Sequence, residues 1–364
     1  MRVNGAAQFA CAISAFASPT AAAAQTAYVH MSGAGREFAV TRIAPNIVQF
    51  TVLRDSYVRQ INSTAIITDQ DVILIDTLTR PSSAALLLEK LRAITPKPVR
   101  IVINTHAHPD HWSGTEVFAR AFPGLEVIAS NQTARFMHLI SPVWAGRAAK
   151  QVADKEAEVA KEKAASKLAD GLALRPEQLG QDERDLVDLK SLADEFARLT
   201  RVFPTVTYND HLHLTHGGVD LDLDAVTGDQ AGNTQVYLPH ERVLITGDLV
   251  SFPMPFFNAR PSKQLASLKA IDATDFAVLI PGHGPAMRDH RFVRLEIALI
   301  EAAMAGVERE IRGGNSEIDT IQSRVTIPEL RAQFTGGDAD LELRYTTRVR
   351  DLVKFVVQEM ADTG

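Results

Sequence analysis

Cysteine is nearly absent from this chain, and two further absences narrow its class. The 364 residues contain one cysteine, Cys11, so no intrachain disulfide can form and a small disulfide-stabilised scaffold is excluded. No run of about 20 uninterrupted apolar residues occurs, and we therefore expect no transmembrane segment. Positive charge is not in excess: the formal net charge is −6, which predicts no nucleic-acid partner and no polybasic attraction to a membrane.

The overall composition is that of an ordinary globular protein. Apolar residues make up 46% and charged residues 23% of the chain. These proportions exclude a disordered or collagen-like chain, and the length suggests one or two domains with a substantial core.

The first 24 residues have the pattern of a secretory signal peptide. Arg2 supplies the basic start, a mildly apolar run follows over residues 6–17, and four consecutive alanines end the segment. Cys11 lies inside it, so a mature chain beginning near Gln25 would contain no thiol. We expect export to the periplasm or beyond, with one domain over residues 25–364; an alanine-rich tail on a cytoplasmic protein is the alternative.

The remaining chain has an α/β pattern interrupted by a helical insertion. A helix is expected from Pro81, and residues 131–200 are rich in Ala, Lys, Glu and Asp with helical spacing. We expect two or three helices there, separated near Gly171 and Gly180, and a helical C-terminal extension over residues 294–364. Strands are expected at residues 47–52, 64–68, 72–76, 99–103, 125–129, 205–208, 211–215, 219–226, 234–238, 242–245 and 276–280.

The strongest chemical signal is His106-x-His108-x-Asp110-His111, directly after a strand expected to be buried. Neutral imidazole is the commonest ligand for zinc and iron, and a carboxylate adds negative charge and a proton acceptor. This pattern predicts a metal site rather than an exposed polar turn.

Two weaker signals lie at the ends of other strands. Asp248 follows the strand at 242–245, and His283 follows the strand at 276–280. Each residue alone is weak evidence, because Asp after Gly is usually a turn residue. Together with the histidine motif they suggest that three strand ends meet at one edge of a sheet.

With these motifs the chain resembles the metallo-β-lactamase superfamily over about residues 38–293, outside the insertion. The resemblance implies a four-layer αβ/βα sandwich with metal ions at a shared sheet edge. It also implies that His106 and His108 bind metal 1, that Asp110, His111 and His283 bind metal 2, and that Asp248 bridges the two ions.

One position departs from the family pattern. Asp229 stands where the family usually has a third metal-1 histidine. A carboxylate can still bind a metal, with a harder oxygen and an extra negative charge. We expect Asp229 to be a metal-1 ligand; the alternative is that it does not bind and metal 1 is lost.

The resemblance implies a metallo-hydrolase, and the N-terminal pattern adds the expectation that it is exported. A small lactam, lactone or other ester-like substrate is expected because a hydrophobic wall would suit it, although the resemblance does not choose among these substrates. Two divalent ions are expected, zinc with iron or manganese as the alternative at site 1. They would supply a hydroxide at neutral pH, and Asp110 would orient it as the catalytic carboxylate. The alternatives are a mononuclear iron sulfur-dioxygenase-like enzyme and a non-catalytic binding protein with a decayed metal site. Trp112 and the aromatic run at 252–257 are candidates for a hydrophobic substrate wall or for plain core packing.

Overall fold

The computed structural model describes residues 26–30, 37–53, 60–165 and 176–363. The predicted signal peptide lies outside these residues. Among the described helices, none is long and apolar enough to cross a membrane.

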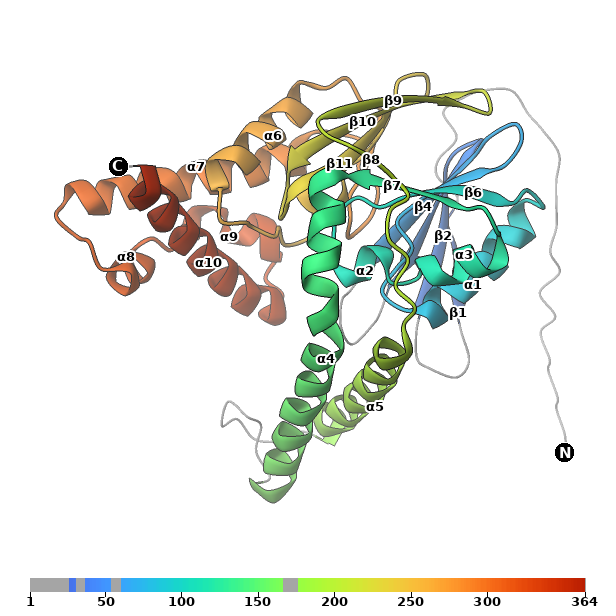
Figure 1. Cartoon of the computed structure of the whole chain (residues 1–364). Coiled ribbons are helices and arrows are strands. Elements are labelled where there is room, and N and C mark those ends of the chain that lie inside the picture. Colours follow the sequence, from blue (N-terminus) through green and yellow to red (C-terminus); the bar gives the residue numbers. More distant parts are fainter. Residues whose placement is uncertain (1–25, 31–36, 54–59, 166–175, 364) are drawn as a thin grey trace, which may run out of the picture.

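Two β-sheets form the centre of the molecule (Figure 1). In the first sheet the strands follow chain order, antiparallel from β1 to β5 and parallel from β5 to β8. Its strands are β1 (Thr26–His30), β2 (Glu37–Ala44), β3 (Ile47–Val52), β4 (Ile61–Ile67), β5 (Val72–Ile75), β6 (Val99–Ile103), β7 (Glu126–Ser130) and β8 (Val206–Tyr208). The second sheet has the order β13-β12-β11-β10-β9, from β9 (His211–His216), β10 (Val219–Thr227), β11 (Ala231–Leu238), β12 (Val243–Ile245) and β13 (Val278–Ile280).

The two sheets pack face to face, and helices cover their outer faces. In β12, Val243 and Ile245 belong to the core between the sheets, whereas Leu244 belongs to the core beneath the outer helices. β12 is apolar at all three positions because both of its faces are buried. Helices α1 (Pro81–Ile94) and α3 (Thr115–Ala121) cover the first sheet, and α6 (Pro261–Ala273) and α7 (Arg291–Arg312) cover the second. This confirms the predicted four-layer αβ/βα sandwich.

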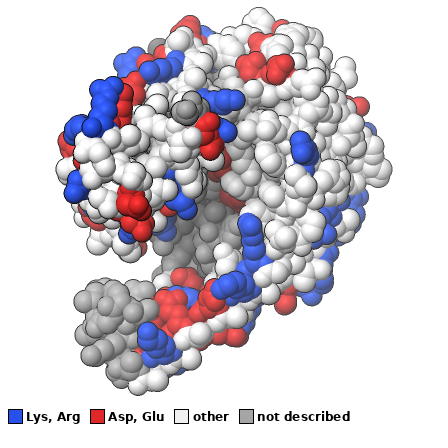
Figure 2. Space-filling view, turned by 60° about the vertical axis from the view of Figure 1, so that its left-hand side comes forward, with Lys and Arg blue, Asp and Glu red and all other residues white. Residues whose placement is uncertain are grey.

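The predicted insertion forms a pair of long helices, α4 (Asn131–Ala165) and α5 (Pro176–Arg198), which projects from the sandwich (Figure 1). Arg80, which is fully buried, forms an ion pair of 2.6 Å with Asp188 and so joins α5 to the start of α1. Gly180 lies inside α5, so the expectation of a helix break there is wrong, while Gly171 falls outside the described residues. In Figure 2 the surface is hollowed between the projection and the rest of the molecule.

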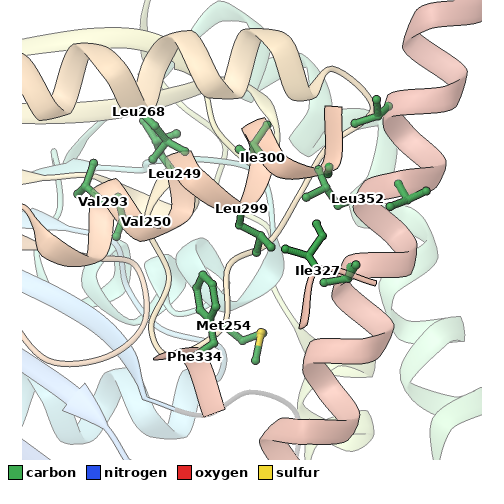
Figure 3. Packing of buried hydrophobic residues seen from close by; sticks show 14 of the residues in the cluster. Leu249, Val250, Met254, Leu268, Val293, Leu299, Ile300, Ile327, Phe334 and Leu352 are labelled. Carbon is green, nitrogen blue, oxygen red and sulfur yellow. The ribbon is translucent and has the colours of Figure 1, made fainter. Parts of the chain in front are cut away.

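The C-terminal part is helical, as predicted, and continues from α7 through α8 (Ile318–Arg324), α9 (Pro328–Thr335) and α10 (Ala339–Thr363). Figure 3 shows part of the apolar cluster beneath these helices, including Leu299, Phe334 and Leu352. Leu249 and Val250, which follow Asp248 closely, are buried in the same cluster. The C-terminal helices thereby anchor the segment that carries Asp248.

Candidate metal centre

The predicted metal-binding residues lie on loops that follow strands of both sheets. The His106 motif follows β6 and continues into α2 (Pro109–Trp112). Asp229 lies in the turn between β10 and β11, and Asp248 lies in the short 3-10 helix η1 (Gly247–Leu249) after β12. His283 follows β13. Because these loops leave both sheets at the same edge, their side chains converge.

The structure arranges the seven side chains in two groups, in each of which the potential ligand atoms lie within 4.8 Å of one another. The first group is His106, His108, Asp229 and Asp248, and the second is Asp110, His111 and His283. Asp248 connects them. Its Oδ2 is 3.7 Å from His106 Nε2 and 3.3 Å from His283 Nε2, and its Oδ1 is 3.3 Å from His111 Nε2.

Asp229 occupies the position expected of a ligand despite its departure from the family pattern. Its Oδ2 is 2.8 Å from His108 Nδ1 and 3.7 Å from His106 Nε2. The His106 and His108 rings themselves approach to 3.0 Å between Nε2 and Nδ1. Three donors from separate residues thus point at a common centre.

Several atoms of the cluster are buried without a hydrogen-bond partner among the described residues. They are Oδ1 of Asp229, Oδ1 of Asp248 and Nε2 of His111. A buried polar atom left unsatisfied costs about 1–3 kcal/mol, and more when it is charged, so such atoms need an explanation. A pair of divalent cations would satisfy them, and the donor set therefore fits metal binding.

The charges of the cluster also call for cations. Burial opposes protonation of His283, yet the carboxylates of Asp248 and Asp110 raise its pKa to about 10. Burial lowers the pKa of His106 to about 4, which keeps this imidazole in the neutral form that binds metals. In the metal-free protein, protons on imidazoles offset the buried carboxylates; bound cations would take over that role.

Asp76 orients one of the predicted ligands from behind. Its Oδ2 lies 2.7 Å from His111 Nδ1, and Thr105 donates to both of its oxygens through its backbone N–H at 2.8 Å and its hydroxyl at 2.7 Å. A carboxylate in this position fixes the ring orientation of a metal-binding histidine and increases its basicity. Asp76 was missed by sequence reasoning, although it follows buried β5 as Asp248 follows β12.

The loop that carries His283 is held tightly against Asp248. The Asn62 side-chain amide donates to the carbonyl oxygens of Pro281 and Gly284, each at 2.8 Å. A Cβ atom at Gly282 would lie 1.9 Å from Asp248 Oδ1. Only glycine permits this close approach of the loop to the carboxylate.

Of the two candidates for a hydrophobic wall, only the aromatic run contributes a ring beside the cluster. Trp112 is buried against Met137 and Phe203, and its indole N–H donates to the Ala107 carbonyl at 3.0 Å. It is a core residue. Phe256 packs edge-on against His283, with ring centroids 5.6 Å apart.

Two further side chains near the cluster come from elements outside the motifs. Trp144 of α4 packs edge-on against His108 at 6.5 Å between ring centroids. The Arg348 guanidinium of α10 lies 4.5 Å from the centroid of the Phe256 ring. Sequence reasoning missed both, because nothing near them in the chain indicates that their helices reach the cluster.

The structure brings none of the other described histidines into the two groups. His211 and His213 face outward on β9 and pair with Asp224 and Asp222, each at 2.8 Å. His216 pairs with Asp71 at 2.9 Å. These three histidines contact neighbouring carboxylates and lie outside the two metal-binding groups.

Comparison with known proteins agrees with this geometry. Residues 56–283, more than half of the chain, match the model of the metallo-beta-lactamase superfamily. A linear primary-alkylsulfatase from Pseudomonas sp. (strain ATCC 19151) is 26% identical over 290 residues, which cover 73% of this chain and 50% of the relative. The chain thus spans about half the length of this known relative.

Solved structures share the fold. The stereoselective inverting sec-alkylsulfatase Pisa1 from Pseudomonas sp. superposes with a TM-score of 0.59 at 20% identity, covering 88% of this chain and 50% of the other. A metallo-beta-lactamase from Pontibacter korlensis superposes with a TM-score of 0.51 at 18% identity, covering 72% and 97%. Together with the two donor groups at the sheet edge, the matched family model establishes that this chain belongs to the metallo-β-lactamase superfamily.

Proposed function

We propose that this protein is a metal-dependent hydrolase that cleaves sulfate monoesters of alkyl alcohols. The observation that carries the hydrolytic part is the position of Asp248, whose carboxylate lies 3.3 Å from His111 Nε2 and 3.7 Å from His106 Nε2. A carboxylate between two donor groups can bridge a pair of divalent cations. The relationship to an alkylsulfatase supports a sulfate ester as the substrate.

Each donor group would hold one cation. His106, His108 and Asp229 would bind the first, Asp110, His111 and His283 the second, and Asp248 would contact both. Imidazole suits zinc, while the harder oxygen of Asp229 keeps iron or manganese as alternatives at the first position. When bound, such ions lower the pKa of a coordinated water to about 7 and stabilise negative charge that develops on substrate oxygens.

Asp110 is the residue that would handle the attacking water. Its Oδ2 is 3.3 Å from His283 Nε2 and 3.5 Å from His111 Nε2. Burial opposes its ionisation, but the two imidazoles hold its pKa below the ordinary value. Asp110 is therefore a carboxylate at neutral pH, able to orient a water molecule and to accept its proton.

The overall reaction consumes one water and releases an alcohol, inorganic sulfate and a proton. The Phe256 ring, beside His283, would face the alkyl part of the substrate. Lactams, lactones and carboxylic esters also react with water at centres of this kind, so substrate choice has to be measured.

The test is sulfate release from octyl sulfate by the metal-loaded full chain, measured by ion chromatography. Octanoyl esters, a lactone and a β-lactam serve as competing substrates. Asp110→Asn should lower the rate at least about 100-fold, the lower end expected for a positioned acid–base group. Asp154→Asn, an exposed carboxylate of α4 paired with Lys150, is the matched control and should leave the rate unchanged.

The outcomes separate the alternatives. Turnover of lactones or carboxylic esters without sulfate release would reject the substrate class and keep the hydrolase. Dioxygen consumption with a persulfide and one iron per chain would instead support the sulfur-dioxygenase-like enzyme. Binding of octyl sulfate without turnover of any substrate would support a non-catalytic binding protein.

We also propose that the insertion limits substrate size, because α4 reaches the metal centre through Trp144 and its projecting end borders a hollow of the surface (Figure 2). Replacing residues 150–184 by a short Gly/Ser linker keeps Trp144 and Asp188 but removes the projecting end. The variant should gain activity on bulky branched sulfates relative to octyl sulfate. Unchanged selectivity would mean that the projection has another role.

Export remains part of the proposal and rests on the N-terminal pattern of residues 1–24. Expression of the full chain in a Gram-negative host should give periplasmic protein whose mature N-terminus lies near Gln25. Cytoplasmic protein that retains Arg2 would contradict it.

A further inference from the structure

The guanidinium of Arg348 is a charged group beside the metal centre that the metal chemistry does not use. It comes from α10 and lies 4.5 Å from the centroid of the Phe256 ring, and this ring also packs against the His283 ring at 5.6 Å between centroids. Arg348 therefore stands one aromatic ring away from a predicted metal ligand.

The hydrogen-bond donors and the positive charge of this guanidinium have few partners among the described residues. Its one ion pair in the described structure, with Asp351, measures 3.9 Å, and none of the described residues accepts a hydrogen bond from it. Its side chain is only 34% exposed. A guanidinium carries five N–H donors and does not lose its charge, so a largely covered one with so loose a partner is suited to bind an anion.

The carboxylates of the metal centre cannot act as the anionic partner of Arg348 once two cations are bound to them. Burial and the nearby Arg344 cation lower the pKa of Arg348, while Asp351, Asp248 and Asp229 act to raise it, so the guanidinium lies within the field of the cluster. Asp110, Asp229 and Asp248, with Asp76 behind His111, supply four negative charges. Two divalent cations would supply four positive charges and balance them, which removes the net attraction of the centre for Arg348.

We propose that Arg348 binds the anionic head group of the substrate and selects negatively charged esters over neutral ones. This inference rests on the proposed hydrolase function and names the residue that recognises its substrate class. A sulfate monoester keeps a negative charge on its oxygens until it is cleaved, and guanidinium groups bind such oxygens through charge-assisted hydrogen bonds. The Phe256 ring, which contacts both Arg348 and His283, would pack against the first carbons of the alkyl chain.

The position of Arg348 is consistent with the approach to the centre. Trp144 of α4 lies against His108, and Arg348 of α10 lies over Phe256 against His283, so each donor group is flanked by an aromatic ring from a different part of the fold. Figure 2 shows the surface hollowed next to the projecting insertion. A ligand with a charged head and an apolar tail matches a guanidinium placed beside aromatic rings.

The experiment compares two octyl ligands that differ in charge, using the metal-loaded full chain. Octanesulfonate carries the anionic head and is not hydrolysed, and octyl methyl sulfone is its neutral counterpart. Dissociation constants come from isothermal titration calorimetry, and KM and kcat are measured for octyl sulfate. Arg350→Met is the matched control, because Arg350 is an exposed arginine of the same helix.

Arg348→Met should raise the dissociation constant for octanesulfonate and the KM for octyl sulfate about 10- to 100-fold, as expected for a lost charge-assisted hydrogen bond. Binding of the sulfone should not change. Arg348→Lys should give an intermediate loss, and Arg350→Met should behave as wild type. Metal content and melting temperature establish that each variant is folded; if the Met variant is not, Arg348→Lys and Arg348→Gln carry the test.

Unchanged sulfonate binding in folded Arg348 variants would overturn the inference, as would equal losses for sulfonate and sulfone. A wild-type protein that fails to hydrolyse octyl sulfate would reject the proposed substrate. If it still binds octanesulfonate in an Arg348-dependent way, the anion-binding role stands and the reactive anionic ester must be of another kind.

Discussion

Replacement of Asp229 by alanine should remove one of two bound cations. Asp229 is buried, and its Oδ2 lies 2.8 Å from His108 Nδ1 and 3.7 Å from His106 Nε2. Without it the first cation would keep two imidazoles and a share of Asp248. Loss of an outer-sphere partner weakens metal binding 10- to 100-fold, so loss of a direct ligand should cost at least about 100-fold, or about 2.7 kcal/mol.

The measurement is metal content after extensive dialysis, by mass spectrometry, followed by competition with a chelator. Wild type should retain two ions per chain, and Asp229→Ala about one, because the Asp110, His111 and His283 group remains intact. Asp224→Ala is the control. Asp224 lies on the same strand, β10, but its side chain is 39% exposed and pairs with His211. Equal metal content in wild type and Asp229→Ala would refute Asp229 as a ligand.

Asp229→His tests the electrostatic part of the same reasoning. The carboxylate offsets part of the cation charge, so a neutral imidazole in its place should make a coordinated water more acidic. Zinc should bind more tightly, and the acid limb of the pH–rate profile should move to lower pH. Movement to higher pH would show that the charge of Asp229 does not act on the reacting water.

Three further perturbations probe the supports of the centre. Asp76→Asn should weaken metal binding about 10- to 100-fold in chelator competition, because it alters the group that orients a ligand. Gly282→Ala should abolish metal binding and activity, since its Cβ would lie 1.9 Å from Asp248 Oδ1, whereas Gly146→Ala, with open space around the added atom, should have neither effect. Burial raises the pKa of Glu296 well above 4.5, so wild type should lose stability as the pH rises above about 4.5 and through the raised pKa. Glu296→Gln should remove that part of the pH dependence, and parallel denaturation curves for both proteins from pH 5 to 9 would contradict this reasoning.

Most of the fold was predictable because its signals are local. The run Val243–Ile245 is apolar at each position, and a strand with both faces buried requires that pattern. The helical spacing of residues 131–200 predicted the insertion. Gly180 shows the limit of local reasoning: a glycine costs a helix only about 1 kcal/mol, and packing against α4 outweighs that cost.

The residues of the metal centre were predictable where they are adjacent in the sequence and were missed where only the fold brings them together. His106 to His111 are adjacent in the chain and recognisable as a unit, whereas Asp76 reaches His111 only because β5 and β6 are neighbours in the sheet. Adjacency in the sequence also suggested Trp112 as a candidate for the substrate wall, because it directly follows His111, but its side chain points into the core. Successive residues of a helix differ by about 100° around its axis, so the neighbour of a ligand faces elsewhere.

The proposed roles place the hydrolytic chemistry and the choice of substrate in different segments of this chain. All seven predicted metal ligands lie within residues 56–283, the part that matches the family model. The side chains that flank them come from elsewhere: Trp144 from the insertion and Arg348 from a helix beyond residue 283. A family of shared fold can keep one hydrolytic centre and change its substrate by altering such added helices. The Arg348 variants should therefore change which esters bind while leaving the metal content untouched, and the Asp229 variants should do the reverse.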